Sequence, residues 1–137
     1  MGNKVYALEW LQFALRNLIT AQHLFEVNHF TDIIVIDAQQ AIEKTLKSII
    51  AYENRKITKT HNLDELASLI TDKILFDDSE IKLLEKITDY YREDRYPNPN
   101  YTLPSYEETK EILDFAQKLF DDVCDKLDIN KNEIIYA

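Results

Sequence analysis

The feature that most constrains the fold of this chain is its shortage of glycine. Its 137 residues include a single glycine, Gly2. All-β folds depend on tight turns with positive φ angles, which glycine adopts most easily. A chain almost without glycine is therefore predicted to be all-α, with long helices joined by few turns. The same shortage excludes the glycine-rich phosphate loops of Walker and Rossmann proteins.

The stretch 5–27 has apolar residues at helical spacing and is predicted to form one long helix. Trp10 and Phe13 lie off its main stripe, so this helix has a second apolar face that could meet a partner subunit. The break is predicted at Asn28-His29. The main stripe consists of Leu8, Leu11, Leu15, Leu18 and Phe25.

The stretch 30–53 is predicted to be a second long helix. Its β-branched run 33–36 could pass for a strand, but the helical period continues for several turns beyond it, through strong helix formers. The short connection between the two long helices predicts an antiparallel hairpin. The stripe of the second helix consists of Ile34, Ala38, Ala41, Ile42, Leu46, Ile49 and Ile50.

Three capping signatures mark the remaining helices. Asn62 with Glu65 opens a short helix, the acidic run 77–80 opens the next, and the run 105–108 opens the last, which ends near Asp128. The whole chain is predicted to be an up-and-down bundle of about five helices. We expect one domain over residues 1–129 and a loose tail over 130–137.

The segment 90–101 is predicted to be the functional corner of the bundle. It contains two of the three prolines and four of the eight tyrosines. Pro97 and Pro99 end the helical pattern, because proline lacks the backbone N–H and disfavours helix in the residue before it. Arg95 should then lie near a helix C-terminus, where exposed carbonyls favour a cation.

The side chains of this corner suit a phosphate and a base. A guanidinium can donate two parallel hydrogen bonds to a phosphate, side-chain amides can hydrogen-bond the edge of a base, and an aromatic ring can stack on the face of the base. In the alternative interpretation, Arg95 only satisfies helix carbonyls and pairs with Asp94 or Glu93. The predicted ligand-binding residues are Arg95, Tyr96, Asn98, Asn100, Tyr101 and Arg92.

The net charge of −9 narrows the classes of partner. Such a field repels polyanions at long range and disfavours generic nucleic-acid binding, although a local basic site can exist. Cys124 has no second cysteine to pair with, and is predicted to be buried on the last helix. No stretch reaches the apolar length of a membrane span or reads as a secretion signal. We therefore expect a cytoplasmic protein that does not contact a membrane.

Other polar residues have both a functional and a plain structural interpretation. His61 could be catalytic, or could hold its connector through a backbone hydrogen bond. Three further groups of polar residues have two interpretations each. In the order given below, they could form a ligand or dimer groove, an RNA contact and a metal site, but each is also typical of a solvated surface. No metal or other cofactor is expected. The groups are Gln39, Gln40, Glu43, Lys44 and Lys47; Arg55, Lys56 and Lys59; and Glu107, Glu108, Glu111, Asp114, Asp121, Asp122 and Asp125.

Three segments, in this order, resemble the HEPN superfamily. They are 38–47 on the second helix, 60–66 at the start of the short helix, and 91–97 with Arg95-Tyr96-Pro97 at its centre. The resemblance covers most of the chain. It implies a small all-α bundle, usually a homodimer that brings two arginine corners together. Many HEPN proteins are metal-independent endoribonucleases, and others are accessory or nucleotide-binding modules, some paired with minimal nucleotidyltransferases in toxin–antitoxin systems.

The chain departs from the nuclease signature of this superfamily, an arginine followed after four to six residues by a histidine. Neither Arg92 nor Arg95 has a histidine in that window. Losing an acid–base group typically lowers a rate by about 10²–10⁴-fold. The resemblance therefore favours a binding or accessory module for a nucleotide or RNA phosphate. It would be a homodimer associated with a nucleotidyltransferase.

Two alternatives stay open. The first is an endoribonuclease toxin whose catalytic groups are drawn from Arg95, Tyr101 and His61. The second is a purely structural dimerisation domain centred on Trp10 and the first two helices.

Overall fold

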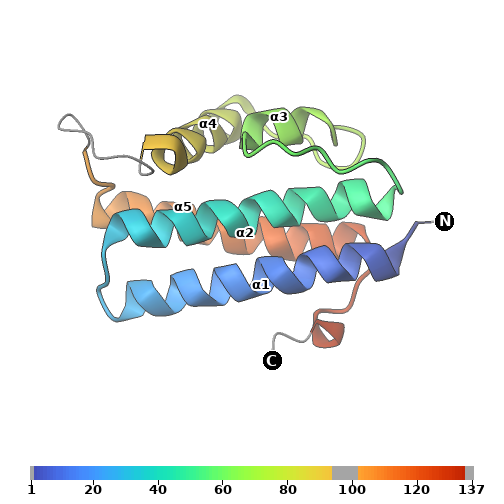
Figure 1. The fold of residues 1–137 in the computed structure, drawn as a ribbon, viewed down its shortest axis with the longest axis horizontal. Coiled ribbons are helices and arrows are strands. Elements are labelled where there is room, and N and C mark those ends of the chain that lie inside the picture. Colours follow the sequence, from blue (N-terminus) through green and yellow to red (C-terminus); the bar gives the residue numbers. More distant parts are fainter. Residues whose placement is uncertain (1, 94–101, 135–137) are drawn as a thin grey trace.

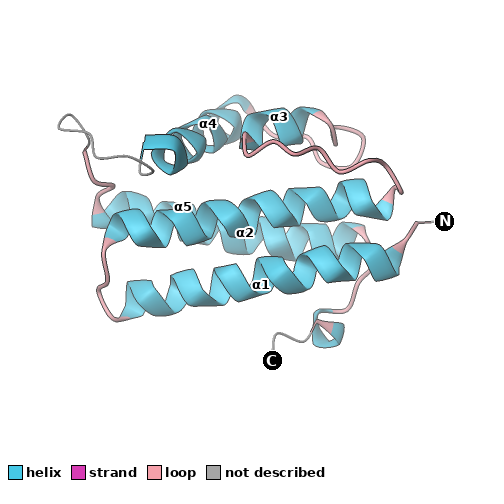
Figure 2. Ribbon diagram, viewed as in Figure 1, coloured by secondary structure: helices cyan, strands magenta, loops and turns pink. Residues whose placement is uncertain are grey.

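The computed structural model describes residues 2–93 and 102–134, and this part of the chain is helical with no strand (Figure 2). The all-α up-and-down bundle predicted from the sequence is confirmed. The two long N-terminal helices form the predicted antiparallel hairpin. The elements are α1 (Lys4–Glu26), α2 (Thr31–Tyr52), α3 (Leu63–Ser68), α4 (Asp78–Glu93), α5 (Tyr106–Lys126) and the 3₁₀ turn η1 (Lys131–Glu133).

Helix α2 is the centre of the bundle. It packs against α1 and α5 on one side and against α3 and α4 on the other (Figure 1). Because neighbours surround it, 14 of its 22 residues are buried, and these include every member of its predicted apolar stripe. The β-branched run 33–36 is helical, as its place in a longer period predicted.

Helix α1 has the predicted period, and Leu11 and Leu18 of the predicted stripe are buried, but the other buried positions differ from the prediction. The residues it places in the core alternate between small and large at steps of three and four. The predicted Leu8, Leu15 and Phe25 are only partly buried against that core. Alanine at alternate members of this buried row lets the backbones of α1 and α2 approach closely. The buried row is Ala7, Leu11, Ala14, Leu18 and Ala21.

The chain ends three helices without glycine. Asn28, Asn54 and Asp128 take positive φ angles of 57°, 57° and 54°, each two residues beyond a helix. At each of the three, the N–H of the positive-φ residue and that of the residue after it donate to carbonyls near the end of the helix, as in the Schellman motif. Asparagine and aspartate tolerate this left-handed conformation better than other non-glycine residues. They therefore replace the glycines that a helical bundle usually uses here.

Two of the three predicted caps form as expected. The backbone N–H of Glu80 donates to Asp77 Oδ1 at 2.8 Å, and the Glu80 carboxylate accepts from the Asp77 N–H at 3.0 Å, which is a complete capping box. At α5, Ser105 Oγ accepts from the N–H of Glu108 at 3.0 Å.

The predicted loose tail is wrong as far as Ile134. Residues 131–133 form a 3₁₀ turn, and Ile134 is 6% exposed within the core. Lys131 also pairs with Asp121 of α5 at 2.9 Å. The apolar side chain after this turn explains why the segment folds back onto the bundle, since its burial stabilises the contact.

Candidate functional site

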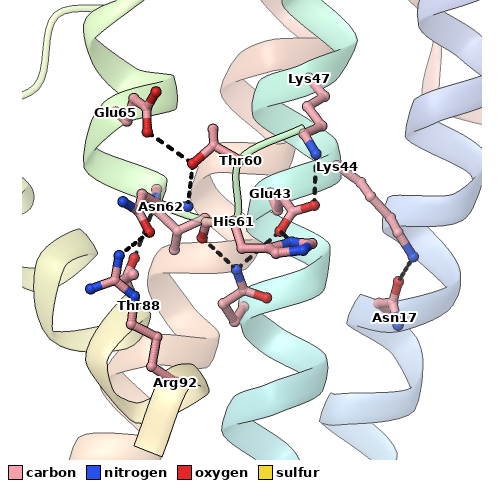
Figure 3. Close-up of polar contacts among 12 residues, drawn as sticks. Asn17, Glu43, Lys44, Lys47, Thr60, His61, Asn62, Glu65, Thr88 and Arg92 are labelled. Carbon is pink, nitrogen blue, oxygen red and sulfur yellow. Dashed lines mark hydrogen bonds and ion pairs between the residues drawn. The ribbon is translucent and has the colours of Figure 1, made fainter. Parts of the chain in front are cut away.

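The start of α3 meets the end of α4 at four residues that we call the α3–α4 corner: His61, Asn62, Tyr91 and Arg92. Figure 3 shows His61, Asn62 and Arg92 of this corner. The rings of His61 and Tyr91 lie with their centroids 5.5 Å apart and tilted by 45°. Arg92 donates from Nη2 to Asn62 Oδ1 at 2.5 Å. Two consecutive residues of the connector thus contact two consecutive residues of α4, and both an imidazole and a guanidinium are presented at the surface of this corner.

Asn62 occupies the predicted cap position of α3, but its side chain does not cap the helix. Its Oδ1 accepts from Arg92 instead, and the Asn62 N–H donates to Thr60 Oγ1 at 3.1 Å. The predicted capping box with Glu65 is also wrong, because the Glu65 carboxylate accepts from the Thr60 hydroxyl at 2.9 Å. The Asn62 side chain, which the local sequence predicted to cap α3, therefore accepts a hydrogen bond from α4 instead.

A row of polar side chains on α2 lies directly under His61. Glu43 Oε1 contacts His61 Nδ1 at 2.9 Å and accepts from Gln39 Nε2 at 3.1 Å. Glu43 Oε2 accepts from Lys47 Nζ at 2.9 Å. Gln39, Glu43 and Lys47 are 0%, 7% and 5% exposed, so this row, here called the α2 ladder, is buried. The interpretation of Gln39, Glu43 and Lys47 as part of a solvated surface is therefore wrong, because all three are buried.

The electrostatics of the α2 ladder favour a charged carboxylate. Burial alone would raise the pKa of Glu43, and it is the largest single influence. Hydrogen bonds from Lys47, His61 and Gln39, together with the charge of Lys47, outweigh it and leave the pKa of Glu43 below its ordinary value. Glu43 is therefore an ionised acceptor at neutral pH, bounded by the Lys47 ammonium on one side and the His61 ring on the other.

His61 makes the backbone hydrogen bond that one of its two interpretations predicted. Its backbone carbonyl accepts from Gln39 Nε2 at 3.0 Å, which is the predicted anchoring of the connector by a backbone hydrogen bond. Its side chain is 50% exposed while its Nδ1 edge contacts buried Glu43. A ring that is fixed on one edge and open to solvent on the other can contact a ligand.

Most of the predicted ligand-binding residues follow α4 in the sequence. Arg95, Tyr96, Asn98, Asn100 and Tyr101 lie outside the described residues. The remaining member of the set, Arg92, lies at the surface of the α3–α4 corner.

The second apolar face predicted for α1 is present. Tyr6, Glu9, Trp10 and Phe13 line a shallow hollow, and Phe13 is 51% exposed. Lys47 Nζ lies 5.8 Å from the Trp10 ring centroid, so this face also covers one end of the α2 ladder.

The described residues do not form the other candidate sites considered from the sequence. Among them, no group of three or more histidine, cysteine or acidic side chains could hold a metal. Arg55 pairs with Glu53 at an exposed position. Cys124 is buried as predicted, and burial raises the pKa of its thiol to about 11, so it is not an activated nucleophile. Within these residues no helix has the length and apolar character needed to cross a bilayer.

Sequence reasoning did not identify the α2 ladder as buried, although a signal was present. Extending its four-residue step in both directions reaches Val35 and Ala51, which are apolar and fully buried. Each four-residue step turns by about 40° around the helix, so the two ends of the row lie on different sides of α2. Apolar residues at both ends indicate a helix that is covered on more than one side. Reading the row in this way would have predicted burial for the three polar residues between them.

Comparison with known proteins agrees with this architecture. The family model for the HEPN domain matches residues 7–127. Among solved structures, the crystal structure of TT1696 from Thermus thermophilus is similar, with a TM-score of 0.70 and 25% sequence identity. That match covers 88% of this chain and 97% of the other. No curated protein matches the sequence. The family match spans both the α2 ladder and the α3–α4 corner, and the chain belongs to the HEPN domain family.

Proposed function

We propose that this HEPN-domain protein binds the phosphate of a nucleotide or of RNA at the α3–α4 corner and works as a binding or accessory module. The observation that carries the proposal is that Arg92 and His61 both reach the surface of this corner, where Arg92 donates to Asn62 and the His61 ring contacts Glu43. A guanidinium can bind a phosphate through two parallel N–H groups, and a second donor beside it adds direction.

The aromatic ring in the corner supports a nucleotide over a bare anion. Tyr91 lies against the His61 ring, and Arg92 is the next residue of α4. Stacking of a base on an aromatic side chain typically contributes about 1–3 kcal/mol and tolerates different bases. With a net charge of −9, a site of this kind selects by local contacts, because the overall field repels polyanions.

The contacts predicted for Arg95, Tyr96, Asn98, Asn100 and Tyr101 stay predictions from sequence. They follow Arg92 closely in the chain, and the proposal includes Arg95 as a second arginine for the phosphate. The association with a nucleotidyltransferase in a toxin–antitoxin system is likewise proposed from the family resemblance. Co-purification of such a protein with this chain from its native cells tests that association.

Titration calorimetry with adenosine 5′-monophosphate and with a ten-nucleotide single-stranded RNA tests the binding proposal. We expect wild-type protein to bind, and Arg92→Ala to lose about tenfold in affinity, the equivalent of about 1.4 kcal/mol. Arg55→Ala is the matched control, because Arg55 is exposed and pairs with Glu53 away from the corner. Identical null titrations from wild type and Arg92→Ala, with both ligands, would remove the proposal.

A second candidate function is metal-independent cleavage of RNA, and one observation favours it. His61 is half exposed and rests on the buried carboxylate of Glu43, which is how an imidazole is oriented for proton transfer. Cleavage should proceed in EDTA and leave cyclic-phosphate ends, and His61→Gln should lower the rate by about 10²–10⁴-fold. Equal products from wild type and His61→Gln would end this candidate.

We also propose that the protein is a homodimer joined through the face of Tyr6, Trp10 and Phe13. Its support is the half-exposed Phe13 and the hollow beside it. Sedimentation at micromolar concentration should give a dimer, and Trp10→Ala should weaken it, since buried tryptophans dominate many interfaces. A wild-type monomer at that concentration excludes this face as a stable interface.

A further inference from the structure

We propose that Glu43 and Lys47 are positioning residues that hold His61 in a single tautomer, with Nδ1 carrying the proton and Nε2 presented to the ligand of the α3–α4 corner. The use of Nε2 by a ligand rests on the proposed function. The tautomer itself does not, and it can be measured on the protein alone.

Only one position of the His61 ring proton agrees with the hydrogen bonds around Glu43. Glu43 Oε2 accepts from Lys47 Nζ at 2.9 Å, and Glu43 Oε1 accepts from Gln39 Nε2 at 3.1 Å. His61 Nδ1 lies 2.9 Å from the same Oε1. An ionised carboxylate only accepts hydrogen bonds, so the nitrogen that contacts it must be the donor. In neutral His61 the proton is therefore on Nδ1 and the lone pair is on Nε2.

Lys47 keeps Glu43 in the state that this arrangement needs. Its side chain is 7% exposed and that of Glu43 is 10% exposed, so water does little to stabilise either charge. Without an adjacent cation, a carboxylate buried to this extent tends to take up a proton and can then donate. The Trp10 ring, 5.8 Å from Lys47 Nζ, and the Gln39 amide confine the pair further.

The connector is fixed by the same ladder. Gln39 Nε2 donates both to Glu43 and to the His61 carbonyl, at 3.1 and 3.0 Å, so the carboxylate and the histidine backbone are held to one amide. Within the described residues, Nε2 of His61 has no hydrogen-bond partner, and the side chain is 50% exposed. Neutral, Nε2 can accept from a ribose hydroxyl, and protonated, it can donate to a phosphate.

Stability alone does not account for such a pair. Replacing a buried ion pair by apolar side chains of similar size is often neutral or stabilising, because removing two charges from water opposes their attraction. A pair that contributes little to folding can still specify one orientation of a neighbouring group. Here the neighbour is a half-exposed imidazole in the corner where Arg92 lies.

Long-range ¹H–¹⁵N spectra of ¹⁵N-histidine-labelled full-length protein test this proposal, since the two neutral tautomers give different nitrogen shifts. The chain has three histidines, and His61→Gln assigns the signals of His61. We expect only the Nδ1–H form in wild type. In Glu43→Met/Lys47→Met, which lacks the acceptor, we expect a mixture of tautomers. Circular dichroism checks that this variant is folded.

A rescue variant separates positioning from packing. Glu43→Gln/Lys47→Met retains an oxygen at the position to which Gln39 donates, so it should restore the Nδ1–H form. Lys110→Gln/Asp114→Asn, which changes an exposed pair at the same spacing on α5, should leave His61 unchanged. An Nε2–H form in wild type, or one tautomer pattern shared by wild type and the Met/Met variant, overturns the proposal. Ligand binding does not enter this readout, so a failed adenosine monophosphate titration counts against the proposed function only.

Discussion

Helices α2 and α5 each contain an ion pair between residues four apart, in opposite environments. Glu43 and Lys47 pair at 2.9 Å across four residues, with side chains 10% and 7% exposed. Lys110 and Asp114 pair at 2.8 Å across four residues, with side chains 59% and 68% exposed. Spacing and N–O distance are nearly identical in the two pairs. The order of acid and base along the helix is reversed, but that order changes an exposed pair by only about a few tenths of a kcal/mol. Burial is therefore the larger difference.

That difference changes what each pair does. An exposed pair at this spacing contributes about 0.3–0.5 kcal/mol and is screened by salt. A buried pair contributes little net stability while intact, but removing one partner leaves a charge without water. The α5 pair is thus a small addition to a solvated surface, whereas the α2 pair constrains everything that packs around it, including His61.

The largest expected effect comes from removing one cation from each pair. Lys47→Met should lower the free energy of unfolding by about 3–5 kcal/mol, because Glu43 would stay buried without its main partner. Lys110→Met should change it by about 0.5 kcal/mol or less. Chemical denaturation followed by circular dichroism measures both.

The double variant Glu43→Met/Lys47→Met is the control for this comparison, and it should recover most of the stability lost in Lys47→Met. Similar losses from Lys47→Met and Lys110→Met would mean that burial does not distinguish the two helices.

Lowering the pH is expected to have a smaller effect on the free energy of unfolding. Burial acts to raise the pKa of Glu43, but hydrogen bonds from Lys47, His61 and Gln39 and the charge of Lys47 lower it overall in the folded chain. The stabilisation from Glu43 is therefore fully present above the ordinary glutamate pKa. It is lost as the pH falls from there through the lower pKa of the folded state.

Denaturation midpoints measured across this acidic range, for wild type and for Glu43→Met/Lys47→Met, isolate the contribution. Wild type should lose more stability on acidification than the double variant. Parallel curves would show that Glu43 does not titrate differently in the folded and unfolded chains.

The smallest effect concerns the caps of two helices, α5 and α3. Ser105 caps α5 through the N–H of Glu108 at 3.0 Å, and Ser105→Ala should lower the free energy of unfolding by about 1 kcal/mol. Asn62→Ala at α3 should lower it by only a few tenths, about the effect of a single exposed polar contact, because Asn62 does not cap its helix. Thermal unfolding compares them, and an equal loss in both would contradict the difference in capping.

The fold could be predicted from sequence because its signals are local. Helical period placed α1 and α2, and acidic or hydroxyl caps placed the starts of α4 and α5. Such signals depend on residues within one or two turns, so they survive without knowledge of the neighbours. The stripe predicted for α1 was nevertheless only partly right. Leu11 and Leu18 are buried as predicted, but Ala7 and Ala14 are buried where Leu8 and Leu15 were predicted.

The candidate site could be predicted only in part. His61 and Arg92 were selected as candidates, but their contacts were not predicted. The His61–Glu43 and Arg92–Asn62 contacts form only when the α2–α3 connector and α4 pack beside α2. Ile134 was likewise assigned to a tail although it reaches the core. Each of these errors concerns contacts between residues far apart in the chain.

The sequence by itself determined that this chain would be a glycine-poor bundle of helices with Asn and Asp at the bends, because helix period, caps and left-handed turns are properties of neighbouring residues. Only the tertiary structure decided that Gln39, Glu43 and Lys47 would lie in the interior beneath His61. Their burial depends on what α1, the α2–α3 connector and α4 place over them. The energy of a charge is set by the water it loses, and that loss is a property of the assembled bundle.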